Sequence, residues 1–329
     1  MERTVSSGWF TIIVVEEPAM TYLKSKTRLY RVSMGMALLL LLNCLGLHPV
    51  LAAPLNVVTT TASLGALVRE VGGTAVSVRV LAAPDRDAHY LDARPSFIAA
   101  LRRADLLVEI GAGLEEGWLP AATRGAANPV LNPGRLGHFR AADFVELRRS
   151  ITQDGPNLGH VHAEGNPHFN VDPKRMATLG YALARRLGEL HPQEAEHFMR
   201  RAENASERLR ETAVMLAAQV VPGQQLVVYH EDLDYLEEWL PVTIVGYLEP
   251  VPGIPPTARH LHGLVDRLNT SHGRILHAQF QPAAGARFLE RELGWPIAAV
   301  PLDPPMDATL DGYLALLAIW AASLEQSEE

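Results

Sequence analysis

The 329-residue chain has almost no cysteine and only one long hydrophobic run, and the two coincide. The single cysteine, Cys44, lies inside the run MGMALLLLLNCLGL. This run of about fourteen residues is shorter than the roughly 20 that a membrane-spanning helix needs, and no later stretch is long enough. We therefore expect a mature protein without a membrane-spanning helix, and also without a disulfide or a thiolate metal ligand.

The apolar run is typical of an export signal. Basic residues precede it and small residues follow it near Ala53, which is the usual layout of a secretory signal peptide. We assign residues 1–53 to this signal and predict a periplasmic protein.

Two details of this segment leave alternatives open. Acidic residues such as Glu16 stand ahead of the basic stretch, so Met20 and Met34 are alternative starts of the chain. A lipid anchor on Cys44 is the competing interpretation of the segment. Asn43 disfavours the anchor, because such sites take Gly or Ala before the cysteine.

Positive charge is also scarce. The formal net charge is -8, and removal of the five basic and three acidic residues of the signal moves it to -10. A protein this acidic is a poor match for nucleic acid or for an anionic membrane surface.

After the signal, short β-branched runs alternate with segments of helical spacing, which predicts parallel sheets covered by helices. We predict an α/β protein with two β/α lobes of mostly parallel sheets, the first over residues 54–172 and the second over residues 221–329. The expected strands are 55–60, 76–81 and 106–110 in the first lobe and 226–229, 242–247, 274–278 and 297–301 in the second, with helices near 231–240, 257–270, 282–293 and 309–324.

The spacing of apolar residues in 173–220, between the lobes, predicts two helices. The second begins at Pro192 and, at about 28 residues, would span some 40 Å. Its position favours a long rigid helix that joins the lobes, whereas its spacing fits an ordinary amphipathic helix packed on one sheet equally well.

Three histidines and one aspartate stand at or beside probable loops. His89 and His230 follow predicted strands, Asp303 lies just beyond another, and His168 precedes the central helices. Ligands of open α/β sheets bind outside the carboxyl ends of strands, so these side chains can meet in one cleft. Three imidazoles and a carboxylate suit Zn²⁺, and we predict His89, His168, His230 and Asp303 as its ligands.

Four protein ligands close the coordination shell, and the HExxH helix of metalloproteases is missing from the sequence. We therefore expect a protein that holds a metal and is not an enzyme. A secreted zinc hydrolase and a surface adhesin or binding module for an organic ligand are the alternatives.

The same segments resemble those of the periplasmic metal-binding proteins of ABC importers with the ZnuA/TroA-like fold. The similarity rests on HYLDARPSFIAALRRADLLVEIGAGLEEGWL at His89, NPHFNVDP at His168, VVYHEDLDY at His230 and PLDPP at Asp303. It implies two lobes joined by a rigid helix, a metal buried between them, and delivery to an ATPase-driven permease of the inner membrane. We expect a monomer.

Zinc is the expected metal and manganese the less favoured one, because manganese-binding relatives tend to use a carboxylate in place of His230. The chain departs from the family pattern in three places. Its loop before the second ligand carries few histidines, His160 and His162, which could form a weak capture site; Asn170 replaces a bulky aromatic; and His277 stands near a common acidic position.

Metal binding requires neutral imidazoles, so capture should weaken as the pH falls through roughly 6.5. Each ligand histidine also needs an acceptor for its other ring N–H. Glu231, Asp232 and Glu249 are candidates, and the sequence does not select among them.

Overall fold

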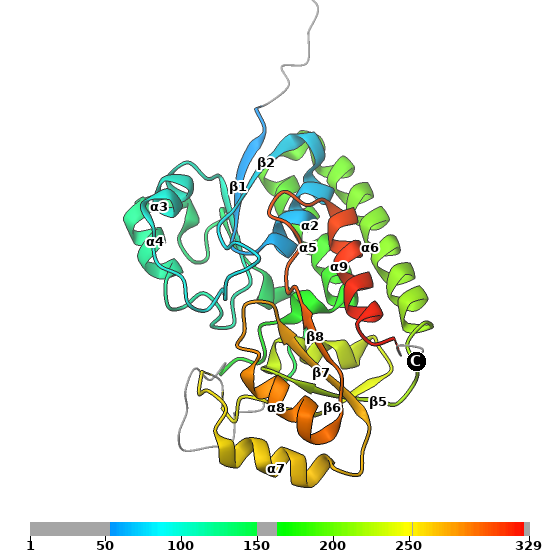
Figure 1. Cartoon of the computed structure of the whole chain (residues 1–329). Coiled ribbons are helices and arrows are strands. Elements are labelled where there is room, and N and C mark those ends of the chain that lie inside the picture. Colours follow the sequence, from blue (N-terminus) through cyan, green and yellow to red (C-terminus); the bar gives the residue numbers. More distant parts are fainter. Residues whose placement is uncertain (1–52, 150–162, 252, 326–329) are drawn as a thin grey trace, which may run out of the picture. The chain divides into compact units, whose positions relative to one another are not determined.

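The computed structural model describes residues 53–149, 163–251 and 253–325 (Figure 1). The predicted signal of residues 1–53 lies outside the described residues but for its last residue, and the loop with His160 and His162 lies wholly outside them. Both remain predictions.

Two four-stranded parallel sheets confirm the predicted α/β architecture. Each strand of the second sheet was expected from its β-branched run. The first sheet holds one unexpected strand, β4, whose three residues include a single buried apolar side chain, Phe139, and are too few to give a pattern. The strand order of the first sheet is β2-β1-β3-β4, with β1 Leu55–Thr59, β2 Val76–Val80, β3 Leu106–Glu109 and β4 His138–Arg140. The strand order of the second sheet is β6-β5-β7-β8, with β5 Gln224–Val228, β6 Val242–Tyr247, β7 Gly273–Ala278 and β8 Ile297–Val300.

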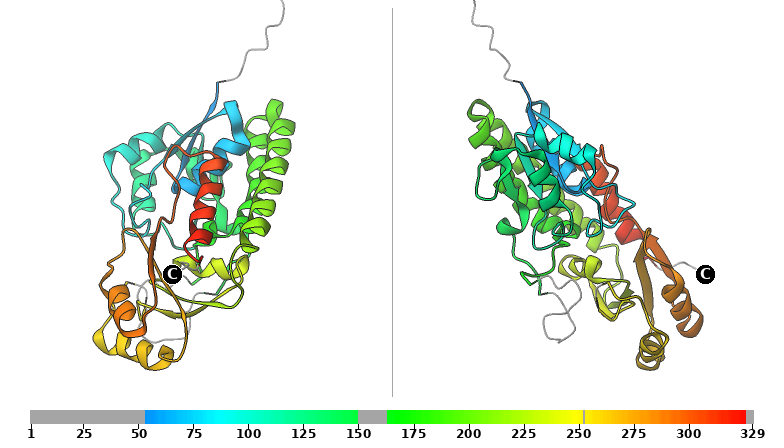
Figure 2. Two further views of the ribbon diagram at one scale, coloured as in Figure 1. Left: turned by 45° about the vertical axis from the view of Figure 1, so that its right-hand side comes forward. Right: turned by 90° about the vertical axis from the view of Figure 1, so that its left-hand side faces the viewer.

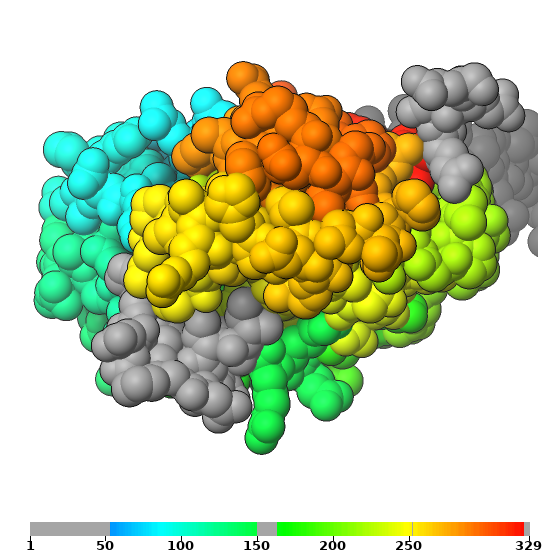
Figure 3. Space-filling model, turned by 60° about the horizontal axis from the view of Figure 1, so that its bottom comes forward, coloured from blue at the N-terminus to red at the C-terminus, as the bar shows by residue number. Residues whose placement is uncertain are grey.

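Helices cover both sheets. The predicted helix at 231–240 is instead a 3₁₀ helix, Glu231–Glu238. Figure 3 shows α7 and α8 side by side on the surface of the second lobe, and residues of both helices share an apolar cluster with β5 and β7. The helices of the first lobe are α2 Ala62–Gly72, α3 Pro95–Arg102 and α4 Leu119–Ala126, and those that follow the second-lobe strands are α7 Ala258–Leu268, α8 Ala284–Leu293 and α9 Leu310–Ala322.

The helices between the lobes are α5 Pro173–Leu190 and α6 Ala195–Ala217. Pro192–Glu194 forms a 3₁₀ turn, so α6 begins later than predicted and has 23 residues, not about 28. At 1.5 Å per residue it spans about 35 Å. Its apolar stripe packs against α5, α2 and α9 (Figure 2). The helix is therefore both a connector and a packed amphipathic helix, and the two interpretations do not exclude each other.

Helix α9 follows the last strand of the second sheet and packs against α2 of the first lobe. One continuous apolar core consequently runs through the lobe junction, from Val57 in β1 to Leu226 in β5 and Trp320 in α9. Two smaller cores lie apart from it, one in each lobe. A core shared between the lobes opposes wide lobe movement, because such movement would expose apolar surface.

None of the helices within the described parts of the chain is both long and apolar enough to span a membrane.

Candidate metal centre

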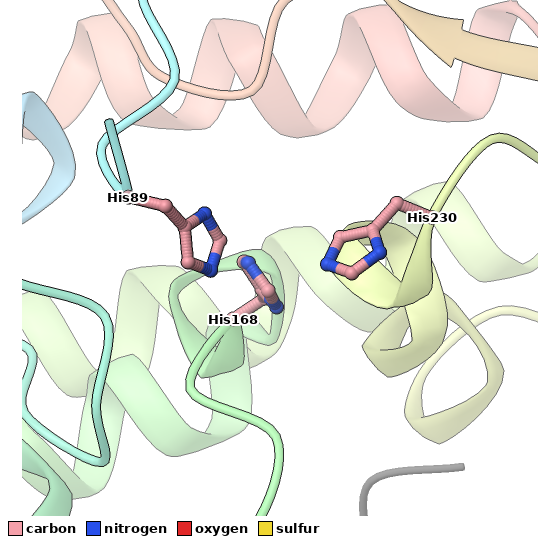
Figure 4. A group of neighbouring side chains, drawn as sticks. All are labelled: His89, His168 and His230. Atoms are coloured by element: carbon pink, nitrogen blue, oxygen red, sulfur yellow. The ribbon is translucent and has the colours of Figure 1, made fainter. Parts of the chain in front are cut away.

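Three histidines from three distant segments meet in the cleft between the lobes (Figure 4). His89 lies in the loop between β2 and α3, His168 directly before the 3₁₀ helix Phe169–Val171, and His230 between β5 and the 3₁₀ helix Glu231–Glu238. One ring nitrogen from each lies within 4.8 Å of the other two. Donors that bind one zinc ion tetrahedrally at about 2.1 Å lie about 3.4 Å apart, so each pair of these nitrogens would have to approach by at most about 1.4 Å to share one ion.

An oxygen atom faces Nδ1 of each histidine. Asp87 Oδ1 lies 2.7 Å from Nδ1 of His89, and Asn166 Oδ1 lies 2.8 Å from Nδ1 of His168. Both acceptors also bind the backbone N–H of their own histidine. An acceptor at Nδ1 selects the tautomer that carries its lone pair on Nε2, which is the form a metal needs.

The third histidine, His230, has Glu249 Oε2 at 3.4 Å from Nδ1. Of the three acceptors considered from the sequence, the structure therefore selects Glu249. Asp87 and Asn166 were missed, although each stands two residues before its histidine. That spacing lets a short side chain reach both the ring and the backbone N–H of the histidine.

Asp303 lies on the wall of the same cavity but outside the group of three ring nitrogens. Its Oδ1 accepts hydrogen bonds from the backbone N–H of Ser63 at 2.7 Å and from the Ser63 hydroxyl at 2.5 Å. Ser63 is in the first turn of α2, so the carboxylate links the two lobes at a helix N-terminus. Burial raises the pKa of Asp303 to about 6, and the bonds from Ser63 oppose this rise.

The cavity has a volume of about 270 Å³ and is lined by both lobes. Four carboxylates lie on its walls, and an exposed arginine, Arg86, joins them. The four are Asp87, Asp232, Glu249 and Asp303.

These charges act on His230. Burial by itself would lower the pKa of His230, but Glu249, Asp232 and Glu231 outweigh burial and raise that pKa to about 9. Burial raises the pKa of Asp87, but its hydrogen bonds with His89 outweigh burial, and the net effect is a lowered pKa. The cleft is thus an environment that stabilises positive charge.

Asp232 differs from the other three carboxylates. Its Oδ2 accepts a hydrogen bond from Gln281 Nε2 at 2.6 Å, whereas no described residue donates to its buried Oδ1. Burial, together with repulsion from Asp87 and Glu249, raises the pKa of Asp232 to about 7, against the opposing effect of His230.

The two substituted positions noted in the sequence have different surroundings. Asn170 lines the cavity, and its Nδ2 lies 3.5 Å from the Ser63 hydroxyl. His277 is buried, and its Nδ1 lies 2.9 Å from the carbonyl oxygen of Ala278. Asn170 therefore borders the link between Ser63 and Asp303.

The comparisons with known proteins agree with this geometry. The family model described as "Zinc-uptake complex component A periplasmic" (ZnuA) matches residues 57–327. The high-affinity zinc uptake system protein ZnuA of Yersinia pestis is 25% identical over 255 residues, which is 71% of this chain and 80% of that protein.

Two solved structures show the same fold. A zinc-bound variant of AdcAII from Streptococcus pneumoniae has a TM-score of 0.66 and 20% identity, covering 83% of this chain and 99% of that one. FpvC of Pseudomonas aeruginosa in complex with Mn²⁺ also has a TM-score of 0.66, with 18% identity, covering 82% of this chain and 98% of that one. Because the family model spans both lobes and the cleft, the chain belongs to the ZnuA family of periplasmic zinc-uptake components.

Proposed function

We propose that this protein captures zinc in the periplasm and delivers it to the membrane permease of an ABC importer. The observation that carries the proposal is the convergence of three imidazoles within 4.8 Å, with Nδ1 of each facing an oxygen acceptor. The Yersinia pestis relative is named for high-affinity zinc uptake. The family consists of substrate-binding transport proteins, and we propose a binding role, not a catalytic one.

The proposed zinc ligands are Nε2 of His89, His168 and His230 and the carboxylate of Asp303. Ser63 holds Oδ1 of Asp303, so we assign the contact with zinc to the other carboxylate oxygen, Oδ2. Three nitrogen donors favour zinc over the harder manganese ion. The manganese complex of FpvC shows that the fold alone does not select the metal, so the donor set supports this choice.

Delivery requires that the metal be released to the permease. The core shared across the junction supports small lobe movements on release, because wide opening would expose apolar side chains of α9 and α6. A monomer exported by the signal of residues 1–53 completes the proposal.

Metal analysis of the protein purified from its native compartment, without added metal, tests the proposal directly. Zinc at one equivalent per chain is the expected result, and N-terminal sequencing of the same sample should find a start near Ala53. One equivalent of manganese, or a failure to bind zinc in titration, would contradict the proposed cargo.

A further inference from the structure

Among the described residues that line the cleft, Asp232 has a buried side-chain oxygen without a hydrogen-bond donor. The residue is 3% exposed, and Gln281 fixes its Oδ2, but among the described residues Oδ1 has no hydrogen-bond donor. An ionised carboxylate that is buried with one oxygen unpaired is unfavourable, and a cation nearby would stabilise it.

The neighbouring carboxylates differ from Asp232 in this respect. Asp87 and Glu249 face Nδ1 of a histidine, and Asp303 accepts two hydrogen bonds from Ser63. Asp232 lines the same cavity as all three. In the metal-free cleft Asp232 faces the carboxylates of Asp87 and Glu249, and the neighbouring His230 is the positive charge that opposes their repulsion.

Asp232 lies outside the group of three ring nitrogens, so it would act on the ion through its charge and not by coordination. Charges buried in the cleft interact strongly because little solvent screens them, and a divalent cation in the cavity would attract Asp232 more strongly than the single charge of His230 does. This additional attraction favours the metal-bound state, and so it adds to the affinity for the ion by thermodynamic linkage.

We propose that Asp232 is a positioning residue that raises the affinity of the cleft for divalent cations through its charge, from outside the ring of ligands. The inference rests on the proposed function, because it concerns the same ion. Nothing in the local sequence marks the role, since Asp232 stands in an acidic segment beside Glu231 and Asp234.

The test compares Asp232→Asn with Asp234→Asn. Asp234 is two residues away in the same 3₁₀ helix and is also buried, but its oxygens accept hydrogen bonds from Tyr247 at 2.9 Å and Asn166 at 3.4 Å. Zinc affinity is measured by competition with a chelator, and the melting temperature is measured with and without zinc.

We expect D232N to bind zinc about 10- to 100-fold more weakly than the parent protein, which is the range found for groups that support a metal site without ligating the metal. D234N should lose less than about threefold. Without zinc, D232N should melt at the same or a higher temperature than the parent, and its rise in melting temperature with zinc should be smaller. Asp232→Glu, which keeps the charge, should recover most of the affinity.

Equal zinc affinities of D232N and the parent would overturn the inference, and so would equal losses in D232N and D234N. If D232N does not fold, Asp232→Ala gives the same comparison. A parent protein that binds no zinc at all would contradict the proposed function itself, and the inference with it, so the two failures are distinguishable.

Discussion

Each lobe contains a buried carboxylate, and the two differ in how many hydrogen bonds they accept. Glu115 in the first lobe and Asp232 in the second are both 3% exposed, and burial raises the pKa of each to about 7. Glu115 accepts hydrogen bonds from the Thr60 hydroxyl at 2.6 Å and from two backbone N–H groups, those of Ile110 at 2.8 Å and Gly111 at 3.0 Å. Asp232 has one donor, Gln281.

The difference in hydrogen bonding distinguishes a carboxylate with a structural role from one with a role in binding. Glu115 ties β1 to the loop after β3, and its satisfied oxygens stabilise the fold itself. Asp232 has one unpaired oxygen and lines a cleft that also contains three imidazoles, where an ion would stabilise its charge. Buried charge in the first lobe is thus structural, whereas at the lobe junction it is preorganised for a cation.

The largest loss of zinc affinity should come from removing an imidazole of the cleft, and it should have no counterpart for an imidazole of the first lobe outside the cleft. We expect His230→Ala to weaken zinc binding by more than about 100-fold, because it removes a ligand and not merely a supporting group. His138→Ala is the matched control, since His138 pairs with Glu109 in the first lobe at 3.1 Å, outside the cleft. Chelator competition measures both variants, and similar affinities of H230A and H138A would remove the basis of the proposed site.

A second prediction concerns Glu115 and stability. Its pKa in the folded state, about 7, lies above the ordinary value of 4.5, so its contribution to stability is present at low pH and is lost as the pH rises through about 7. Glu115→Gln cannot ionise. Between about pH 5 and about pH 8, the zinc-free parent should therefore lose about 3 kcal/mol more unfolding free energy than E115Q.

Denaturant unfolding at the two pH values measures that difference, with Glu203→Gln, on the exposed face of α6, as the control for a carboxylate in contact with solvent. The role assigned to Glu115 fails if E115Q and the parent show the same dependence on pH.

The third prediction concerns protons in the cleft. Since the pKa of His230 is raised to about 9, this ring is protonated in the metal-free protein at neutral pH and must lose its proton to bind zinc. Binding at about pH 7.5 should release about one proton from this residue, and affinity should fall as the pH is lowered below about 9. This onset lies well above the value near 6.5 expected from the sequence, because acidic neighbours surround the ring.

Calorimetric titrations in buffers of different ionisation enthalpy count the protons released. A binding enthalpy that is the same in every buffer would show that no proton leaves, and the electrostatic account of the cleft would be wrong.

The smallest effect is expected at His191, where a buried group without a partner lies far from the cleft. Within the described parts of the chain neither ring nitrogen of His191 has a hydrogen-bond partner, and the ring packs edge-on against Phe198. His191→Leu should raise the unfolding free energy by about 1 kcal/mol, since it removes buried polar atoms from an apolar junction. Zinc affinity should not change. A loss of stability on thermal unfolding would show that the ring makes a bond that the geometry does not reveal.

Much of the fold was predictable because it is local. Runs such as 226–229 and 274–278 carry their strand pattern in the sequence, and three of the four proposed ligands were placed correctly at or beyond the ends of strands. Strand β4 was not predictable, because its three residues are too few to show a strand pattern and the strand is defined by its pairing with β3. The partners of His89 and His168 were predictable in principle from the spacing of two residues.

The sequence by itself determined the alternation of strands and helices, the identity of the three histidines and the acidic character of the chain, since each is written in residue types and their spacing. Only the tertiary structure decided which carboxylates have partners. The bond between Ser63 and Asp303 joins residues 240 positions apart, and the hydrogen bond that Asp232 Oδ2 accepts comes from Gln281, which is 49 positions away. Whether a buried charge is satisfied is a property of the surrounding volume, and segments distant in the chain fill that volume.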